Sequence, residues 1–237
     1  MTTLFQPRDE PIRLVVVNAG VSDPSSTRLL ADRIAQKSLD RLSAQGFATT
    51  LDVIDLAPLA VDIAKAMVAG FPGEKVKAAI DFLARADAVI AATPVYKAGI
   101  SGLFKSFIDL VDNDLLIARP IVLAATAGTI RHAMVGDEQM RPLFAFLRAM
   151  PMPTSVFAAP EDWASPELGA RIDRAAGELS QFVASGVGRA IVNTGWNGNQ
   201  HQFGGNATQA QRKAEDVNLD SDLMRLAAGG TLLPEAQ

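Results

Sequence analysis

The stretch AVIAATPVYKAGISGLFKSFIDL, residues 88–110, joins an apolar run to an amphipathic segment. Residues 88–93 carry no charge and have the length of a strand, which is typical of a strand buried on both faces. Pro94 favours an extended residue before it, and Gly99 lets the chain turn. Beyond the turn, apolar side chains occupy one side of a predicted helix: Leu103, Phe107 and Leu110. The stretch therefore predicts a buried strand that leads through a turn into a helix.

The same alternation of apolar runs and amphipathic segments extends over most of the chain. Five strands are predicted, at residues 12–17, 49–56, 88–93, 121–125 and 155–159. Helices are predicted between them, including one over 137–150, and a last one begins at Ser165 and Pro166. Strands without polar alternation indicate a parallel sheet covered by helices on both faces. Right-handed crossovers with one reversal of direction predict an α/β, doubly wound, five-stranded sheet of order 2-1-3-4-5.

Composition excludes several classes of function. The net charge of −4 provides no positive field for nucleic acid or an anionic membrane. The absence of cysteine excludes disulfides, thiolate nucleophiles and Cys-ligated metals, and two histidines make a His-rich metal site improbable, so we expect no metal. No apolar run of about 18 residues and no signal-like N-terminus is present, so we expect a cytoplasmic protein.

The C-terminal part of the chain differs in composition from the rest. Residues 1–188 are predicted to form one domain, and residues 189–237 an extension that is partly flexible. Residues 193–210 are rich in Asn, Gln and Gly, which is typical of a loop or arm. Apolar residues between 219 and 226 predict a short amphipathic helix. This extension is a candidate for contact with a neighbouring subunit or another protein.

In a doubly wound sheet, ligands bind beyond the carboxyl ends of the strands, where the strand order reverses. The loop after the first strand contains Ser22, Ser25, Ser26 and Thr27 and leads directly into a helix. Hydroxyls and the free N–H groups of a helix start form a site for a phosphate monoester, although one hydroxyl could serve only as a helix cap. Neither G-x-G-x-x-G nor the G-x-x-x-x-G-K-[ST] loop is present, which favours a single terminal phosphate.

The loops after the third and fourth predicted strands are also unusual. Residues 94–97, Pro-Val-Tyr-Lys, could present backbone amides and an aromatic ring to a flat heterocycle, or form an ordinary connection. Ala127 and Gly128 permit close approach of a ligand to the backbone. His132 could contact a ligand, or act as a capping or interface residue.

Other catalytic patterns are weak. G-x-S-x-G and H-E-x-x-H are absent, so a hydrolase has no support beyond scattered hydroxyls. Asp109, Asp112 and Asp114 lie at a predicted helix end, where a solvated terminus is a better interpretation than an acid–base pair.

Three segments together resemble the NAD(P)H-dependent FMN reductases of the flavodoxin-like superfamily, in particular the alkanesulfonate-type reductases and those that serve luciferase-like monooxygenases. TPVYKAGISGLFKSFIDL is similar to the family's Pro-x-Tyr loop and Leu-Lys-x-x-x-Asp helix; Phe104 and Lys105 occupy the Leu-Lys positions and Asp109 the Asp. LAATAGTIRHAMVGDEQMRPLFAFLRAM is similar to the family's Gly-Thr loop and helix. NAGVSDPSSTRLLA matches less well, because Pro24 stands where many relatives have Arg. The resemblance covers residues 12–185.

The resemblance implies the reduction of FMN by NAD(P)H and the supply of reduced flavin to a partner monooxygenase. It places the phosphate at residues 22–27 and the isoalloxazine beside residues 94–97 and 127–129. It implies no catalytic side chain, because hydride passes between the cofactors. The implied cofactor-binding residues are Ser22, Pro24, Ser25, Ser26, Thr27, Pro94, Val95, Tyr96, Lys97, Ala127, Gly128, Thr129 and His132.

The family is typically dimeric or tetrameric, so a homodimer or homotetramer is implied as well, with small-molecule flavin and nicotinamide substrates. Two alternatives remain open on the same fold. One is a quinone, azo-dye or chromate reductase with tightly bound FMN, and the other is a flavodoxin-like electron carrier without a nicotinamide site.

Overall fold

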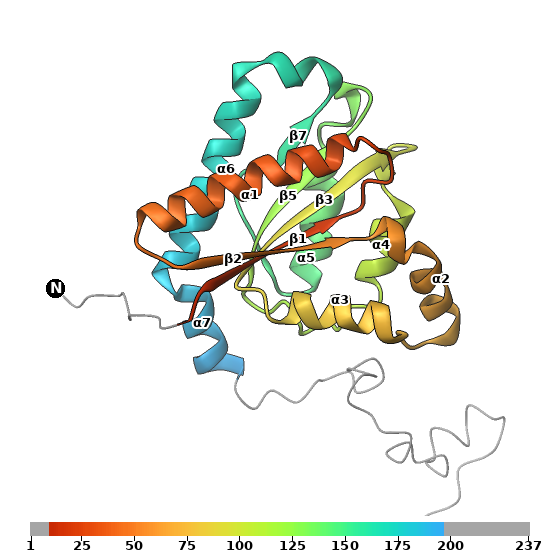
Figure 1. The fold of residues 1–237 in the computed structure, drawn as a ribbon, viewed down its shortest axis with the longest axis horizontal. Coiled ribbons are helices and arrows are strands. Elements are labelled where there is room, and N and C mark those ends of the chain that lie inside the picture. The colour runs from red at the N-terminus through yellow and green to blue at the C-terminus, as the bar shows by residue number, and fades with distance from the viewer. Residues whose placement is uncertain (1–9, 197–237) are drawn as a thin grey trace, which may run out of the picture.

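The computed structural model describes residues 10–196, and Figure 1 shows a twisted sheet with helices on both faces. Within these residues the sheet has seven strands along the path β2-β1-β3-β5-β6, with β4 paired to β3 and β7 paired to β5. The strands are β1 (Ile12–Asn18), β2 (Thr49–Asp55), β3 (Ala88–Tyr96), β4 (Gly99–Ile100), β5 (Pro120–Thr126), β6 (Met150–Pro151) and β7 (Val156–Ala158).

The helices divide between the two faces of the sheet (Figure 1). The α-helices are α1 (Ser26–Ala44), α2 (Ala60–Ala69), α3 (Glu74–Ala84), α4 (Gly102–Ile108), α5 (Arg141–Phe146), α6 (Pro166–Ser185) and α7 (Val187–Ile191). The short turns are η1 (Ala57–Leu59), η2 (Ile130–His132) and η4 (Pro160–Ala164), which are 3-10 helical, and η3 (Gly136–Met140) and η5 (Val192–Trp196), which are π-helical. None of the helices in this part of the chain has the length and apolarity to cross a bilayer.

Alternate side chains of the central strands pack into two separate cores. In β1, Leu14 and Val16 pack with α1 and α6, whereas Val15 and Val17 pack with α2, α3, α4 and α5. All four side chains are at most 1% exposed. Burial of both strand faces explains why these strands read as unbroken apolar runs.

The predicted fold class and strand order are confirmed. β1 lies between β2 and β3, β3 pairs with β5, and β5 pairs with β7, all in parallel. For the five predicted strands this is the order 2-1-3-4-5. The reversal of direction therefore falls between β1 and β3, as the doubly wound arrangement requires.

The predicted number of five strands is too small. A two-residue turn at Lys97 and Ala98 folds the chain back, so that β4 pairs with the end of β3 before α4 begins. β6 pairs with the start of β5, while β7 pairs with its end. Pro153 lies between these two short strands, and proline cannot donate to a ladder.

The helix predicted over 137–150 differs from the observed structure at both ends. It starts as the π-helical turn η3, and α5 ends at Phe146. Arg148 then adopts a left-handed conformation with φ of 57°, and the amide of Met150 donates to the carbonyl of Arg119 over 2.8 Å. Pairing with the sheet has replaced the last turn of the predicted helix.

Helical structure extends beyond the predicted domain boundary. α6 ends at Ser185, its C-cap Gly186 has φ of 67°, and α7 and η5 extend the chain to Trp196. The proposed boundary at residue 188 falls within α7. Residues 193–196, predicted as loop, are part of η5. The remainder of the extension, including the amphipathic helix predicted near 219–226, lies outside the described residues.

The aromatic pair between α4 and α5 provides a test of the core. Phe104 is fully buried, and its ring meets that of Phe144 edge-on at 6.2 Å between centroids. Phe104→Ala is expected to lower the free energy of unfolding by about 3–5 kcal/mol, measured by urea denaturation. Phe146, which is 67% exposed, is the matched control, and its change to Ala is expected to cost about 0.5 kcal/mol or less. Equal losses in the two variants would contradict the packing described here.

Candidate functional site

Four loops at the carboxyl edge of the sheet surround a cavity of about 390 Å³, a size typical of small-molecule sites. The loops follow β1, β3, β5 and β7. The residues that line the cavity are Gly20, Val21, Ser22, Ser26, Thr27, Pro94, Val95, Tyr96, Thr126, Ala127, Gly128, Ala158, Pro160 and Trp163.

The loop after β1 is held tightly against the strand end. Asn18, buried at the end of β1, donates from Nδ2 to Asp55 Oδ1 over 2.8 Å and accepts the amide of Gly20 at 3.1 Å. A Cβ at Gly20 would lie 2.0 Å from Ser25 Oγ. A larger residue here would displace the Ser25 hydroxyl, so glycine lets the loop pack against the first turn of α1.

The start of α1 presents hydroxyls with different roles. Ser25 is the N-cap, and its Oγ accepts the amide of Arg28 at 3.2 Å. Ser22 and Ser26 are exposed, and their hydroxyls make no hydrogen bond to any other residue within 10–196. Residues 26–29, the first turn, contain no acidic residue. The partial positive charge of the helix start is therefore left without a side-chain carboxylate, which favours an anion.

Arg28 is engaged elsewhere. Its guanidinium donates to Asp32 Oδ1 and Asp55 Oδ2, each over 2.8 Å, and it does not line the cavity. The hydrogen bond to Asp32 and the nearby Asp55 carboxylate raise the pKa of Arg28 above its already high value, despite partial burial. Arg28 thus braces the start of α1 against the end of β2.

Thr27 connects two elements of the site. Its hydroxyl lies 2.7 Å from that of Thr126 at the end of β5, and both residues are buried. Of the predicted residues in this loop, Ser22, Ser26 and Thr27 line the cavity. Ser25 and Pro24 lie next to them in the chain but do not line it.

The loop after β3 forms a second wall. Pro94 and Val95 are buried, whereas Tyr96 is 52% exposed at the rim. The hydroxyl of Thr93 accepts the amide of Ser101 at 3.1 Å, and Ser101 in turn caps α4. The chain is thereby fixed on both sides of the hairpin. Lys97, predicted here, is at the turn itself and does not line the cavity.

The loop after β5 contributes Ala127 and Gly128 to the lining. Thr129 instead caps η2, where its Oγ1 accepts the amide of Arg131 at 3.4 Å. His132 lies in η2 and is half-buried. The structure therefore does not bring Thr129 and His132 to the cavity wall.

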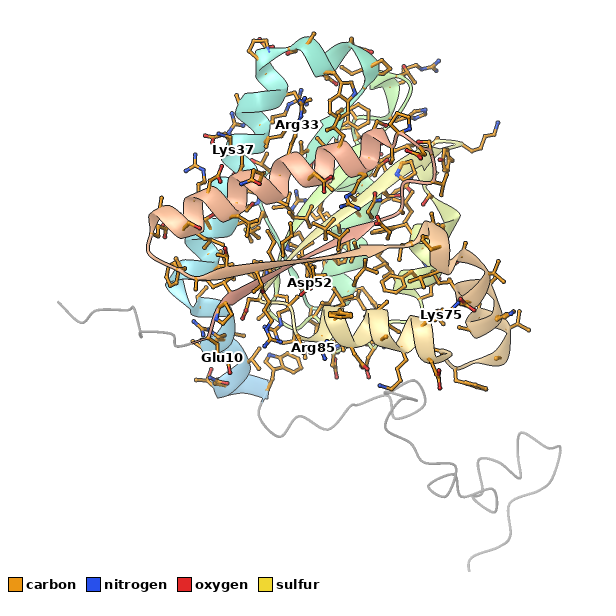
Figure 2. The ribbon with its side chains drawn as sticks, in the orientation of Figure 1. Glu10, Arg33, Lys37, Asp52, Lys75 and Arg85 are labelled. Carbon is orange, nitrogen blue, oxygen red and sulfur yellow. The ribbon has the colours of Figure 1, made fainter. Side chains whose placement is uncertain are left out.

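Sequence reasoning missed the fourth loop, which follows β7. Pro160 and Trp163 of η4 line the cavity, and Arg33 of α1 lies over the Trp163 ring at 5.3 Å. Arg33 projects from α1 toward the segment before α6 (Figure 2). The signal was available, because a tryptophan shortly after a predicted parallel strand belongs to the same edge of the sheet. The other residues missed are Gly20, Val21, Thr126 and Ala158.

Fold and site together define a doubly wound, flavodoxin-like α/β protein whose cavity lies at the switch point of the sheet. The profile of the family described as NADPH-dependent FMN reductase matches residues 12–164. The chain belongs to this family, so the predicted resemblance is confirmed. It is an oxidoreductase that uses NAD(P)H and FMN.

Individual relatives agree with this assignment. An NADH-dependent FMN reductase, SfnE, from Pseudomonas putida is 35% identical over 171 residues, covering 70% of this chain and 89% of that protein. An FMN reductase (NADPH) from Pseudomonas aeruginosa is 35% identical over 173 residues, with the same coverage. The X-ray structure of an oxidoreductase from Corynebacterium diphtheriae has 42% identity and a TM-score of 0.71, covering 73% of this chain and 97% of that one.

The hydroxyl pair between α1 and β5 yields a stability prediction. Thr27→Val keeps a similar shape but removes the partner of the buried Thr126 hydroxyl, so the free energy of unfolding is expected to fall by about 1–3 kcal/mol. The double variant Thr27→Val/Thr126→Val leaves no orphaned hydroxyl and is expected to be more stable than the single one. Urea denaturation of the flavin-free protein measures these two variants and the single variant Thr126→Val. A double variant whose loss equals the sum of the two single losses would show that the hydroxyls are not coupled.

Proposed function

We propose that the cavity at the carboxyl edge is the FMN site, and that the enzyme supplies reduced FMN to a flavin-dependent monooxygenase. When bound, FMN accepts a hydride from NAD(P)H. The observation that carries the proposal is the pair of unengaged hydroxyls, Ser22 and Ser26, at a helix start that faces the same cavity as Pro94, Val95 and Tyr96.

At the α1 end of the cavity, the residues fit a phosphate monoester. Ser22 and Ser26 can donate to its oxygens, and the free amides of the first turn add to them. Gly20 keeps the loop close enough for these groups to converge, since any side chain there would meet Ser25. With Arg28 bound to two carboxylates, neutral donors provide the recognition.

At the other end, the residues fit a flat heterocycle. Pro94 and Val95 form a buried apolar wall, and Ala127 and Gly128 leave the backbone accessible. Trp163 adds an aromatic ring to the lining. These residues orient the ring and exclude water, and none of them has to act as a general acid or base. Five of the predicted residues do not line the cavity, so the proposal depends less on them: Pro24, Ser25, Lys97, Thr129 and His132.

We also propose that the protein is a homodimer or homotetramer. Support comes from exposed apolar side chains: Val21 and Tyr96, which line the cavity, and Ile130 and Met134, in and after η2, are each more than half exposed. A neighbouring subunit would cover apolar surface that otherwise faces water. Sedimentation equilibrium of the full-length chain decides between these states and a monomer.

The assay that tests the activity is anaerobic oxidation of NADH and NADPH, with and without added FMN, FAD and a quinone. Turnover is expected to require added FMN, and the reduced flavin is expected to support a flavin-dependent monooxygenase in a coupled assay. A yellow protein that oxidises NAD(P)H without added flavin would favour a quinone or azo-dye reductase with tightly bound FMN. A protein that binds FMN but oxidises neither nucleotide would indicate an electron carrier.

The phosphate end can be tested by comparing FMN with riboflavin, which lacks the phosphate. Ser22→Ala/Ser26→Ala is expected to raise the dissociation constant of FMN about 10- to 100-fold, because charge-assisted hydrogen bonds are lost. Riboflavin binding should change little. Ser43→Ala, an exposed position in the last turn of α1, is the matched control. If both flavins weakened equally, the two hydroxyls would not be phosphate ligands. Fluorescence quenching measures each constant.

A further inference from the structure

The turn between β3 and β4 adopts a conformation that its own residues disfavour. Lys97 and Ala98 have φ of 50° and 64°, and the flanking Tyr96 and Gly99 face each other in the ladder. A two-residue hairpin with positive φ at both central positions strongly prefers sequences such as Asn-Gly. A lysine and an alanine have a Cβ that resists this conformation. Something outside the turn must hold it.

The side chain of Gln139 contacts the backbone on both sides of Gly99, where the turn leads into β4. Its Nε2 donates to the carbonyl of Ala98 over 3.0 Å, and its Oε1 accepts the amide of Ile100 at 3.1 Å. A Cβ at Gly99 would lie only 3.2 Å from Oε1. The missing side chain at Gly99 thus gives the amide group room to lie against the backbone between its two partners.

The element that carries Gln139 is itself firmly anchored. Gln139 belongs to η3, whose last residue, Met140, is fully buried. Arg141 follows and donates to Asp137 Oδ1 over 2.6 Å and to the carbonyl of Met152 over 2.9 Å. At the other end of η3, Gly136 packs so closely on Ser155 that an added Cβ would lie 3.1 Å from it. A rigid support of this kind can maintain a disfavoured turn.

We propose that Gln139 is a positioning residue that clamps the Lys97–Ala98 turn and thereby fixes Val95 and Tyr96 in the wall of the flavin cavity. Gln139 does not line the cavity, so it acts through the hairpin. This inference rests on the proposed function, because the cavity is taken to be the FMN site. The clamp itself is a property of the flavin-free protein and can be measured without FMN.

The first variant is Gln139→Ala in the full-length chain. Hydrogen exchange of the Ile100 amide in the flavin-free protein is expected to accelerate about tenfold or more, since its acceptor is lost. The dissociation constant of FMN is expected to rise about tenfold. In turnover, KM for FMN should rise while kcat changes less than about threefold, because the reacting groups are unchanged once the site is filled.

The rescue variant separates a clamp from a direct contact. Gln139→Ala/Ala98→Gly places glycine where φ is positive, so the turn can form without help. FMN affinity is expected to return to within about threefold of wild type. Glu138→Ala, an exposed neighbour in the same π-helical turn, controls for changes in the helix and should alter neither readout.

Two results would overturn the proposal. One is an Ile100 exchange rate and an FMN affinity that Gln139→Ala leaves unchanged. The other is a loss of FMN affinity that Ala98→Gly does not restore, which would mean that Gln139 acts by another route. A wild-type chain that fails to bind FMN would remove the proposed function and the role of Gln139 in flavin binding, while the exchange measurement would still decide whether Gln139 holds the turn.

Discussion

The parallel pairing of β1 with β3 is the constraint on which the rest of the molecule depends. In the register of this pair, Asn18 lies opposite Ala92, and in the pairing of β3 with β5, Pro94 lies opposite Thr126. Because the three strands end at nearly the same height, their loops open on one edge and can share a cavity. The helices that cover the two faces follow from the same constraint, since strands in the middle of the sheet cannot face water.

Similar residues in one loop serve different purposes, and only their surroundings distinguish them. Ser25 and Thr27 are engaged within the protein, one as a helix cap and the other through Thr126. Ser22 and Ser26 have no such partner among the described residues. The first pair shapes the loop, and the second is left available for a ligand. An arrangement of this kind lets the fold be complete before any flavin is present.

The features that were predictable from the sequence are those set by burial and local chain geometry. Unbroken apolar runs predicted five of the seven strands, crossover rules predicted their order, and the hydroxyl-rich helix start predicted one wall of the candidate site. The hairpin at Lys97 and Ala98 could not be predicted, because it contradicts the preferences of those residues and depends on Gln139, about 40 positions away in the chain. Trp163 was missed for a different reason: the expected switch point directed attention to three loops only. Thr129 and His132 were also predicted to bind the cofactor, but Thr129 caps the short turn η2 and His132 belongs to it, and neither residue lines the cavity.

Arg28 has a consequence for how long a flavin stays bound. Its guanidinium is already paired with Asp32 and Asp55, so the proposed phosphate site has hydroxyls and backbone amides but no fixed positive partner from this residue. A phosphate dianion is bound less tightly by neutral donors than by a site that also provides an ion pair. Weaker binding of this kind suits the proposed role of FMN as a substrate that departs after each turnover, whereas an additional ion pair to the phosphate would favour a flavin that stays bound.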